Sequence, residues 1–140
     1  MNARHPEQIK RMNDLQKNKL CHFCVDGFET HSAPIIYKNS SWFVTANDFP
    51  YEGSTHHYLI VSKKHINNLS QINKKAQTEL FGSINWLKKK FKTTGESIFM
   101  RSGDMNYTGA TLDHLHIHFI VGQKQNKKSE RLLVTLGYKN

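Results

Sequence analysis

The chain has 140 residues, 37% of them hydrophobic and 22% charged, which suits a single globular domain with its own core. No aliphatic run exceeds three residues and the first residues lack the apolar core of a signal peptide, so the sequence excludes a membrane-spanning protein and indicates a cytoplasmic one. The formal net charge of +9 favours a polyanionic partner, either a phosphorylated small molecule or, as the less favoured alternative, RNA or DNA.

Apolar periodicity predicts two helices. Residues 6–19 are typical of a polar N-terminal helix with Pro6 in its first turn. Residues 70–91 carry apolar side chains every three or four positions, which predicts a helix with one buried face, and Ser70 is its expected N-cap. The lysines at 88–90 suit the negative end of that helix dipole.

Short stretches rich in aromatic and β-branched residues predict strands, with loops rich in Gly, Asn and Asp between them. The predicted strands are residues 33–38, 41–46, 56–62, 96–102 and 112–122, with a further strand at 131–138 in the C-terminal tail. This order predicts an α+β fold with a largely antiparallel five-stranded sheet, one main helix and the N-terminal helix. We expect a helical extension over residues 1–19, the domain over 20–122 and a basic tail over 123–140.

The two cysteines, Cys21 and Cys24, are separated by two residues. In a reducing compartment such a lone pair is more typical of half a metal site than of a structural disulfide. A thioredoxin-like pair would need a strand before it and a helix after it, whereas here a Gly-containing turn follows. Zinc is the favoured interpretation, and a redox pair or two unrelated thiols are the alternatives.

The segment "DHLHIHFIV", residues 113–121, places His114, His116 and His118 at alternate positions. On a strand, alternate residues share a face, so the histidines lie on one face and the intervening apolar residues enter the core. Neighbouring same-face positions are about 6.6–6.8 Å apart and the outer two about 13 Å, so bonds of about 2.0–2.1 Å to zinc hardly let one ion bind all three. The histidines therefore have at least partly different roles, unless the row is only a solvated face.

A tetrahedral structural zinc site needs two ligands besides the cysteine pair. His65, just past the third strand, and His114, at the start of the row, are the candidates. For His65 the alternative is an exposed histidine at the start of a helix. A catalytic metal at the histidine row is the least favoured alternative.

His116 and His118 are then left for chemistry. A neutral imidazole is a competent nucleophile near pH 7, because its ordinary pKa is about 6.5, and attack on phosphorus gives a phosphoramidate. A second histidine on the same face can protonate a leaving oxygen or nitrogen. The hydroxyl of Thr111, just before the row, can bond to a phosphate oxygen, although a strand-edge threonine without such a role is an equal interpretation.

Two stretches resemble the histidine-triad superfamily. "HLHIHFI" at residues 114–120 matches its pattern of three histidines and alternating apolar residues at all seven positions, and "HHYLIVSKKHI" at 56–66 resembles its upstream strand. "NDFPYEGS" at residues 47–54 resembles the nucleoside-facing loop of the branches near the uridylyltransferases. The resemblance covers about residues 20–122 and implies the fold of that family there.

The resemblance implies a hydrolase or nucleotidyl transferase acting on a nucleoside monophosphate, expected to be a purine nucleotide, that is bonded to a leaving group. His116 would attack the α-phosphorus and form a nucleotidyl-histidine. His118 would contact the phosphate and the bridging atom. His57 would complete the phosphate pocket, with the adjacent His56 as its competitor. Thr111 is added to this catalytic set.

The resemblance also implies binding sites and an assembly. Zinc-bearing members use positions that map onto Cys21, Cys24, His65 and His114, which is the ligand set reached above by counting donors. Asn47 or Asp48 would meet the ribose hydroxyls, and family members of this size usually form homodimers.

Because the sequence departs from the family pattern in places, it does not determine which leaving group the substrate carries. Arg101 stands near the position where the phosphoramidase branch usually has asparagine, and Thr111 replaces the commoner serine. The intact His118, where uridylyltransferase relatives carry glutamine, favours hydrolysis over sugar-nucleotide transfer. Similarity to aprataxin-type enzymes keeps deadenylation of 5′-adenylylated nucleic acid as an alternative, and a zinc-stabilised nucleotide- or RNA-binding module without turnover is a further one.

Overall fold

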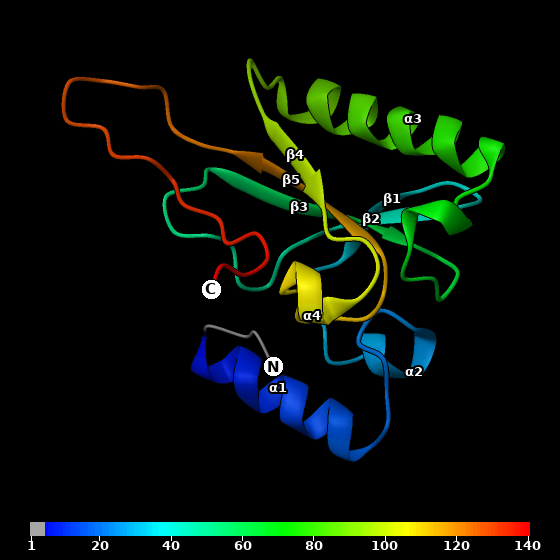
Figure 1. Cartoon of the computed structure of the whole chain (residues 1–140). Coiled ribbons are helices and arrows are strands. Elements are labelled where there is room, and N and C mark those ends of the chain that lie inside the picture. The colour runs from blue at the N-terminus through cyan, green and yellow to red at the C-terminus, as the bar shows by residue number, and fades with distance from the viewer. Residues whose placement is uncertain (1–4) are drawn as a thin grey trace.

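The computed structural model describes residues 5–140, and its five strands form one antiparallel sheet in the order β1-β2-β3-β5-β4 (Figure 1). The strands are β1 (Ile35–Lys38), β2 (Trp42–Ala46), β3 (His56–Ser62), β4 (Ser97–Met100) and β5 (His116–Val121). The helices are α1 (Pro6–Lys17), α2 (Val25–Phe28), α3 (Lys74–Phe91) and α4 (Met105–Thr108), with a 3-10 turn, η1, at Leu69–Gln71. The predicted α+β fold with a five-stranded antiparallel sheet is confirmed. The first four residues of the predicted extension lie outside the described residues.

Helix α3 covers one face of the sheet (Figure 1). Ile84 and Leu87 of α3 pack in one core cluster with Ile117 and Phe119 of β5 and with Leu115 just before that strand. These three are the apolar residues that alternate with the histidines, so the predicted inward-facing set forms the core. The face opposite α3 is therefore the one left to the histidines.

The opposite face carries a second, smaller apolar cluster. It joins Phe43 of β2 and Leu59 and Val61 of β3 to Phe23, which lies between the two cysteines. Figure 1 shows α1 and α2 on this side of the sheet, away from α3. The N-terminal segment thus packs beside the histidine face.

The predicted start of α3 and the predicted loop at residues 103–111 are wrong. Asn73 is the N-cap in place of Ser70, because its side chain accepts a hydrogen bond of 2.8 Å from the Ala76 amide. Ser70 lies instead in η1, which Asn68 caps. The segment 103–111, expected to be a loop, contains α4, whose N-cap is Asp104.

Strand β5 begins at His116, so the prediction of a strand from residue 112 is wrong at its start. The amide of Leu115 donates to the carbonyl of Ile66, a residue beyond the end of β3, at 2.6 Å. This hydrogen bond replaces the regular pairing with β3 for the residues before His116. His114 consequently lies in the preceding loop.

The C-terminal tail contains no strand over residues 131–138, and that prediction is also wrong. The tail folds back toward α4, where the Gly137 amide donates to the Thr108 carbonyl at 3.1 Å. Gly137 has a φ of 65°, which interrupts an extended backbone, and a Cβ there would lie 2.7 Å from the Tyr107 carbonyl oxygen. The tail therefore bonds to α4 and adds no strand to either edge of the sheet. None of the helices within residues 5–140 is both long and apolar enough to cross a membrane.

Candidate functional site

His57, His116 and His118 lie on the sheet face opposite α3. Leu59 pairs with His118 and Val61 pairs with His116 across β3 and β5, and both partners belong to the apolar cluster on this face. His57 precedes Leu59 by two residues and so shares its side of β3. The adjacent His56 lies on the other face, where its ring centroid is 4.8 Å from that of Phe91 in α3.

The ring of His116 has a defined tautomer. Its Nδ1 lies 2.7 Å from the carbonyl oxygen of His114, which can only accept, so Nδ1–H is the donor and Nε2 carries the lone pair. Burial lowers the pKa of His116 to about 4, against the opposing effect of that hydrogen bond. At neutral pH the ring is therefore neutral, with a free lone pair on Nε2.

His57 and His118 form a hydrogen-bonded pair. The backbone N–H of Tyr51 donates to Nδ1 of His57 at 3.1 Å, so a neutral His57 carries its proton on Nε2. This Nε2 lies 2.8 Å from Nδ1 of His118, which therefore accepts, and a neutral His118 carries its proton on its own Nε2. Asn47 Nδ2 is farther from His57 Nε2, at 3.3 Å. The ring centroids of His116 and His118 are 5.0 Å apart, so a ring with a lone pair on Nε2 lies beside a ring with a proton on Nε2.

Aromatic rings hold His118 in place. Phe99 of β4 pairs with His118 in the sheet, and the two rings are stacked at 4.5 Å with an interplanar angle of 6°. Tyr51 stacks with His118 at 5.8 Å and 17°. Tyr51 thus fixes both the plane of His118 and, through its amide, the tautomer of His57.

Arg101 follows β4 and reaches the same histidine. Its Nη1 lies 3.5 Å from Nε2 of His118, and its Nη2 donates to the carbonyl of Thr135 in the tail. The guanidinium carbon is 5.2 Å from the centroid of the Phe99 ring. Arg101 is therefore a permanent cation beside the His57–His118 pair.

Asp48 is strongly bonded within the chain. Its carboxylate accepts from the amides of Ser32 at 2.7 Å and Ala33 at 3.0 Å, and from Arg11 of α1 at 2.7 Å. Burial opposes ionisation, but these hydrogen bonds outweigh it and hold the pKa of Asp48 below its ordinary value. Asp48 therefore anchors α1 and retains less capacity for a ribose than the sequence indicates. Asn47 lies beside His57.

A cavity of about 1110 Å³ opens over the histidine face, slightly above the range of about 300–1,000 Å³ that is usual for small-molecule sites. Six of the predicted or noted residues line it: Asn47, Asp48, Arg101, Thr111, His116 and His118. Its other walls come from α1, with Arg11 and Met12, and from the tail, with Lys128 and Arg131. The cavity can therefore hold a nucleotide-sized ligand against the histidines.

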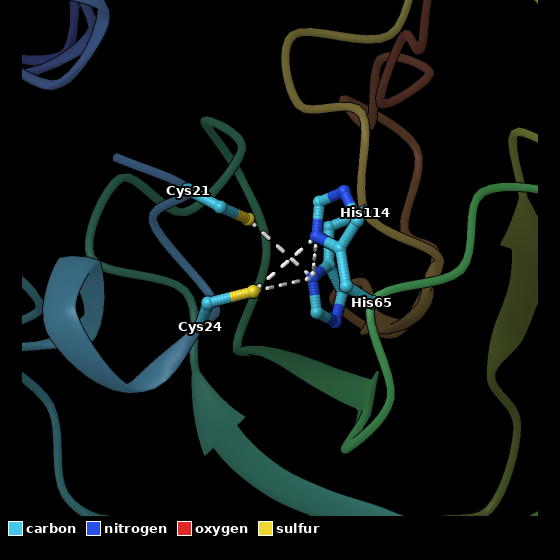
Figure 2. A group of neighbouring side chains, drawn as sticks. All are labelled: Cys21, Cys24, His65 and His114. Carbon is cyan, nitrogen blue, oxygen red and sulfur yellow. Dashed lines mark hydrogen bonds between the residues drawn. The ribbon is translucent and has the colours of Figure 1, made fainter. Parts of the chain in front are cut away.

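Cys21, Cys24, His65 and His114 come together at the start of the histidine row, as Figure 2 shows, with their ligand atoms all within 4.8 Å of one another. Cys21 Sγ is 3.4 Å from Nδ1 of His114, Cys24 Sγ is 3.3 Å from Nδ1 of His65, and the two Nδ1 atoms are 3.2 Å apart. Tetrahedral bonds of about 2.3 Å to sulfur and about 2.0–2.1 Å to nitrogen require ligand separations of about 3.3–3.8 Å. These donors are spaced for one ion.

The chemistry of the four donors also fits zinc. Nε2–H of His114 donates to the Ser62 carbonyl at 2.6 Å, which directs the Nδ1 lone pair into the cluster, as is usual for a metal-ligating histidine. Burial, and next the Cys21 sulfur, raise the pKa of the Cys24 thiol to about 11. A divalent cation reverses that effect because it deprotonates a coordinating thiol. Two thiolates and two imidazoles are a typical structural zinc set.

Gly27 of α2 supports the cysteine pair. A Cβ at this position would lie 1.7 Å from the carbonyl oxygen of Cys21. We expect Gly27→Ala to lower the free energy of unfolding by about 1–3 kcal/mol or more through overpacking. Gly82→Ala is the matched control, because its Cβ would meet nothing within 4 Å and alanine favours the helix. Urea unfolding that shows equal effects for the two substitutions would contradict this account.

Phe99 and Arg101, which lie beside His118, were not predicted as site residues from the sequence. Phe99 lies in β4 and Arg101, two positions later, directly follows the strand, so the alternation of that strand was a usable signal. His22 and His31 also line the cavity, with Nε2 of His22 at 2.9 Å from Nδ1 of His31. No spacing or motif in the sequence marks that second pair.

The fold and site define an antiparallel α+β domain with three histidines on the open face of its sheet and a Cys₂His₂ cluster at the head of the row. The HIT domain model matches residues 28–125, well over half of the chain. The chain therefore belongs to the HIT domain family, and the resemblance noted in the sequence is confirmed.

Solved structures with a similar fold include three HIT proteins. A HIT family hydrolase from Clostridium thermocellum is 22% identical with a TM-score of 0.60, over 81% of this chain and 96% of that one. A Zn-bound histidine triad family protein from Mycobacterium smegmatis is 19% identical with a TM-score of 0.56, over 77% and 78%. A histidine triad nucleotide-binding protein from Candida albicans is 17% identical with a TM-score of 0.59, over 79% and 86%. These identities establish the fold alone. A comparison with curated protein sequences found no match.

Proposed function

We propose that the chain is a nucleotide hydrolase that cleaves the bond between the α-phosphate of a nucleoside monophosphate and a leaving group, in a phosphoramidate or a dinucleoside polyphosphate. The observation that carries this proposal is the neighbouring pair of His116, with its lone pair on Nε2, and His118, with a proton on Nε2, in the wall of one cavity. Similarity to a HIT family hydrolase and to a histidine triad nucleotide-binding protein supports it.

In the proposed first step, Nε2 of His116 forms a bond to the α-phosphorus and the bond from phosphorus to the bridging atom breaks. The bridging atom keeps the electron pair and accepts a hydrogen bond from Nε2–H of His118. A phosphate leaves as an anion, whereas an amine takes a proton that the His57–His118 pair has first taken up from water. The His114 carbonyl stabilises the positive charge on His116 through Nδ1–H.

In the second step, water attacks the α-phosphorus of the nucleotidyl-histidine and the phosphorus–nitrogen bond breaks. The electron pair returns to Nε2 of His116. The water proton goes to the His57–His118 pair if an amine left, or to the departed phosphate through solvent. In both cases the histidines return to their starting state.

The remaining site residues have supporting roles in this proposal. Thr111 bonds to a phosphate oxygen, and Asn47, with the free capacity of Asp48, meets the ribose. Cys21, Cys24, His65 and His114 would hold a structural zinc ion, which would tie the N-terminal segment to the sheet and take no part in the steps above. The homodimer implied by the resemblance stays a prediction.

A second candidate substrate is 5′-adenylylated nucleic acid. Lys128 and Arg131 of the tail line the cavity, and the chain carries a net charge of +9. Binding of such a substrate should weaken steeply with salt, because each phosphate contact releases counterions. Turnover that is insensitive to salt, with no affinity for oligonucleotides, would remove this candidate.

The experiment that tests the proposed function is incubation with adenosine and guanosine 5′-monophosphates linked to amines or to phosphates, followed by acid quench and intact-protein mass analysis. We expect an added mass of one nucleotide on the chain and steady release of the nucleoside monophosphate. Binding without an adduct or turnover would instead identify a non-catalytic nucleotide-binding module.

His57→Ala and His56→Ala form a matched pair for the proposed phosphate pocket. We expect His57→Ala to lower kcat by about 10²-fold or more, because His118 loses the hydrogen bond that sets its tautomer. His56→Ala should change kcat less than threefold, since that ring packs against Phe91 on the other face of the sheet. Steady-state kinetics with the reverse ranking would show that the wrong histidine has been assigned.

A further inference from the structure

Arg101 is an incompletely paired cation in the wall of the cavity. Within residues 5–140 it has no carboxylate partner, and its buried Nε–H has no hydrogen-bond acceptor. Its contact with His118 is long, at 3.5 Å, and joins two donors when His118 carries its proton on Nε2. In the described part of the chain, the acceptor for this guanidinium is the carbonyl of Thr135. An anion in the cavity would compensate this unpaired charge.

The guanidinium is held in place before any ligand binds. The Phe99 ring stacks on His118, and its centroid lies 5.2 Å from the guanidinium carbon of Arg101. One ring therefore contacts both groups. The planar fork of arginine matches the oxygens of a phosphate, and a fixed fork loses little entropy on binding. Arg101 is therefore arranged as a phosphate clamp.

The position of Arg101 decides which phosphate it meets. In the proposed function His118 contacts the bridging atom, and Arg101 lies next to His118 Nε2. A phosphate bonded to the bridging atom would lie within reach of both groups. The tail continues the positive charge with Lys128 and Arg131, although Glu52 and Glu130 also line the cavity. The remaining acid, Asp48, is already paired with Arg11.

We propose that Arg101 is a specificity-determining residue that binds the phosphate of the leaving group, so that the chain prefers nucleotides joined through a phosphoanhydride to those joined to an amine. This inference rests on the proposed function. The bond that forms joins His116 Nε2 to the α-phosphorus. The bond that breaks joins that phosphorus to the bridging oxygen, which keeps the electron pair and leaves on a phosphate anion held by Arg101. Water then releases the nucleoside monophosphate, and its proton passes to the departed phosphate.

Two substrates with the same nucleoside and α-phosphate test the inference: diadenosine triphosphate and the tryptamine phosphoramidate of AMP. We expect Arg101→Met to lower kcat/KM on diadenosine triphosphate by about 10²-fold, as for loss of one preorganised charged donor, and on the phosphoramidate by less than about fivefold. Arg101→Lys, which keeps the charge but loses the fork, should fall between. Lys89→Met is the control, because it removes one positive charge from the exposed surface of α3.

Equal losses on both substrates would overturn the inference, because Arg101 would then act on the shared α-phosphate. No loss on either would equally overturn it. If the wild-type chain turned over neither substrate and formed no adduct, the proposed function would fail, and calorimetric titration with AMP and ADP would decide the role of Arg101. We expect the wild type to bind ADP at least tenfold more tightly than AMP and Arg101→Met to lose that advantage, whereas equal wild-type affinities would refute the clamp.

Discussion

Replacing His116 with alanine is expected to lower kcat/KM by about 10⁴-fold or more on every nucleotide substrate and to abolish the covalent adduct. The reason is that the proposed reaction passes through a bond to Nε2 of this one ring, and loss of a nucleophile removes the path itself. Single-turnover kinetics and intact-protein mass measure the two effects. The fold should survive, because the apolar core against α3 does not include His116.

A chemical rescue separates loss of the nucleophile from general damage. His116→Gly leaves a space beside the phosphorus, and free imidazole added to this variant should restore part of the turnover. Urea unfolding of both variants should match the wild type within about 1 kcal/mol, as expected for a half-buried site. Full activity of His116→Ala would refute the nucleotidyl-histidine mechanism. If a variant kept its activity and formed an adduct at another residue, that residue would be the nucleophile in place of His116.

Replacing Cys21 with serine is expected to remove one zinc ion per chain and to destabilise the fold by several kcal/mol. Structural zinc contributes about 10–16 kcal/mol of apparent binding energy in isolated zinc fingers, and here two apolar clusters retain part of the stability without it. At about 2–4 °C per kcal/mol, the melting temperature should fall by on the order of 10 °C. Atomic absorption and thermal unfolding measure the two results, and a strong chelator should reproduce them in the wild type.

His5→Ala serves as the control for zinc content, because His5 lies outside the Cys₂His₂ cluster. It should keep one zinc per chain. The Cys21→Ser variant should also lose activity at temperatures where it is still folded, since His114 carries both the ligand Nδ1 and the carbonyl that orients His116. Zinc retained in Cys21→Ser, or an unchanged melting temperature, would contradict the structural role.

Local sequence patterns, such as alternation along a strand, predicted most of the fold. The alternation around His116 placed Leu115, Ile117 and Phe119 in the core, because strand geometry forces alternate side chains to opposite faces. The strand at 131–138 was predicted from the same kind of pattern and is absent, since the tail has a left-handed turn at Gly137 and bonds to α4. Whether an apolar stretch pairs with a sheet depends on distant partners that local composition does not encode.

The residues around the site were predictable to different degrees. The grouping of Cys21, Cys24, His65 and His114 followed from ligand counting, because a tetrahedral ion demands four donors. The environment of His118 did not follow, because Phe99, Arg101 and Tyr51 reach it only through strand pairing and loop closure. Likewise, the pairing of Asp48 with Arg11 required the position of α1.

The hydrogen bond from Arg101 to the carbonyl of Thr135 joins the sheet wall of the cavity to its tail wall. The sheet wall is built from strand pairing and core packing, whereas the tail wall is held by hydrogen bonds to α4 and to Arg101. Changes beyond residue 122, such as a purification tag or a proteolytic nick, would therefore alter apparent substrate affinity while thermal stability stayed constant. For this chain, a normal melting curve would be no guarantee of an intact binding site.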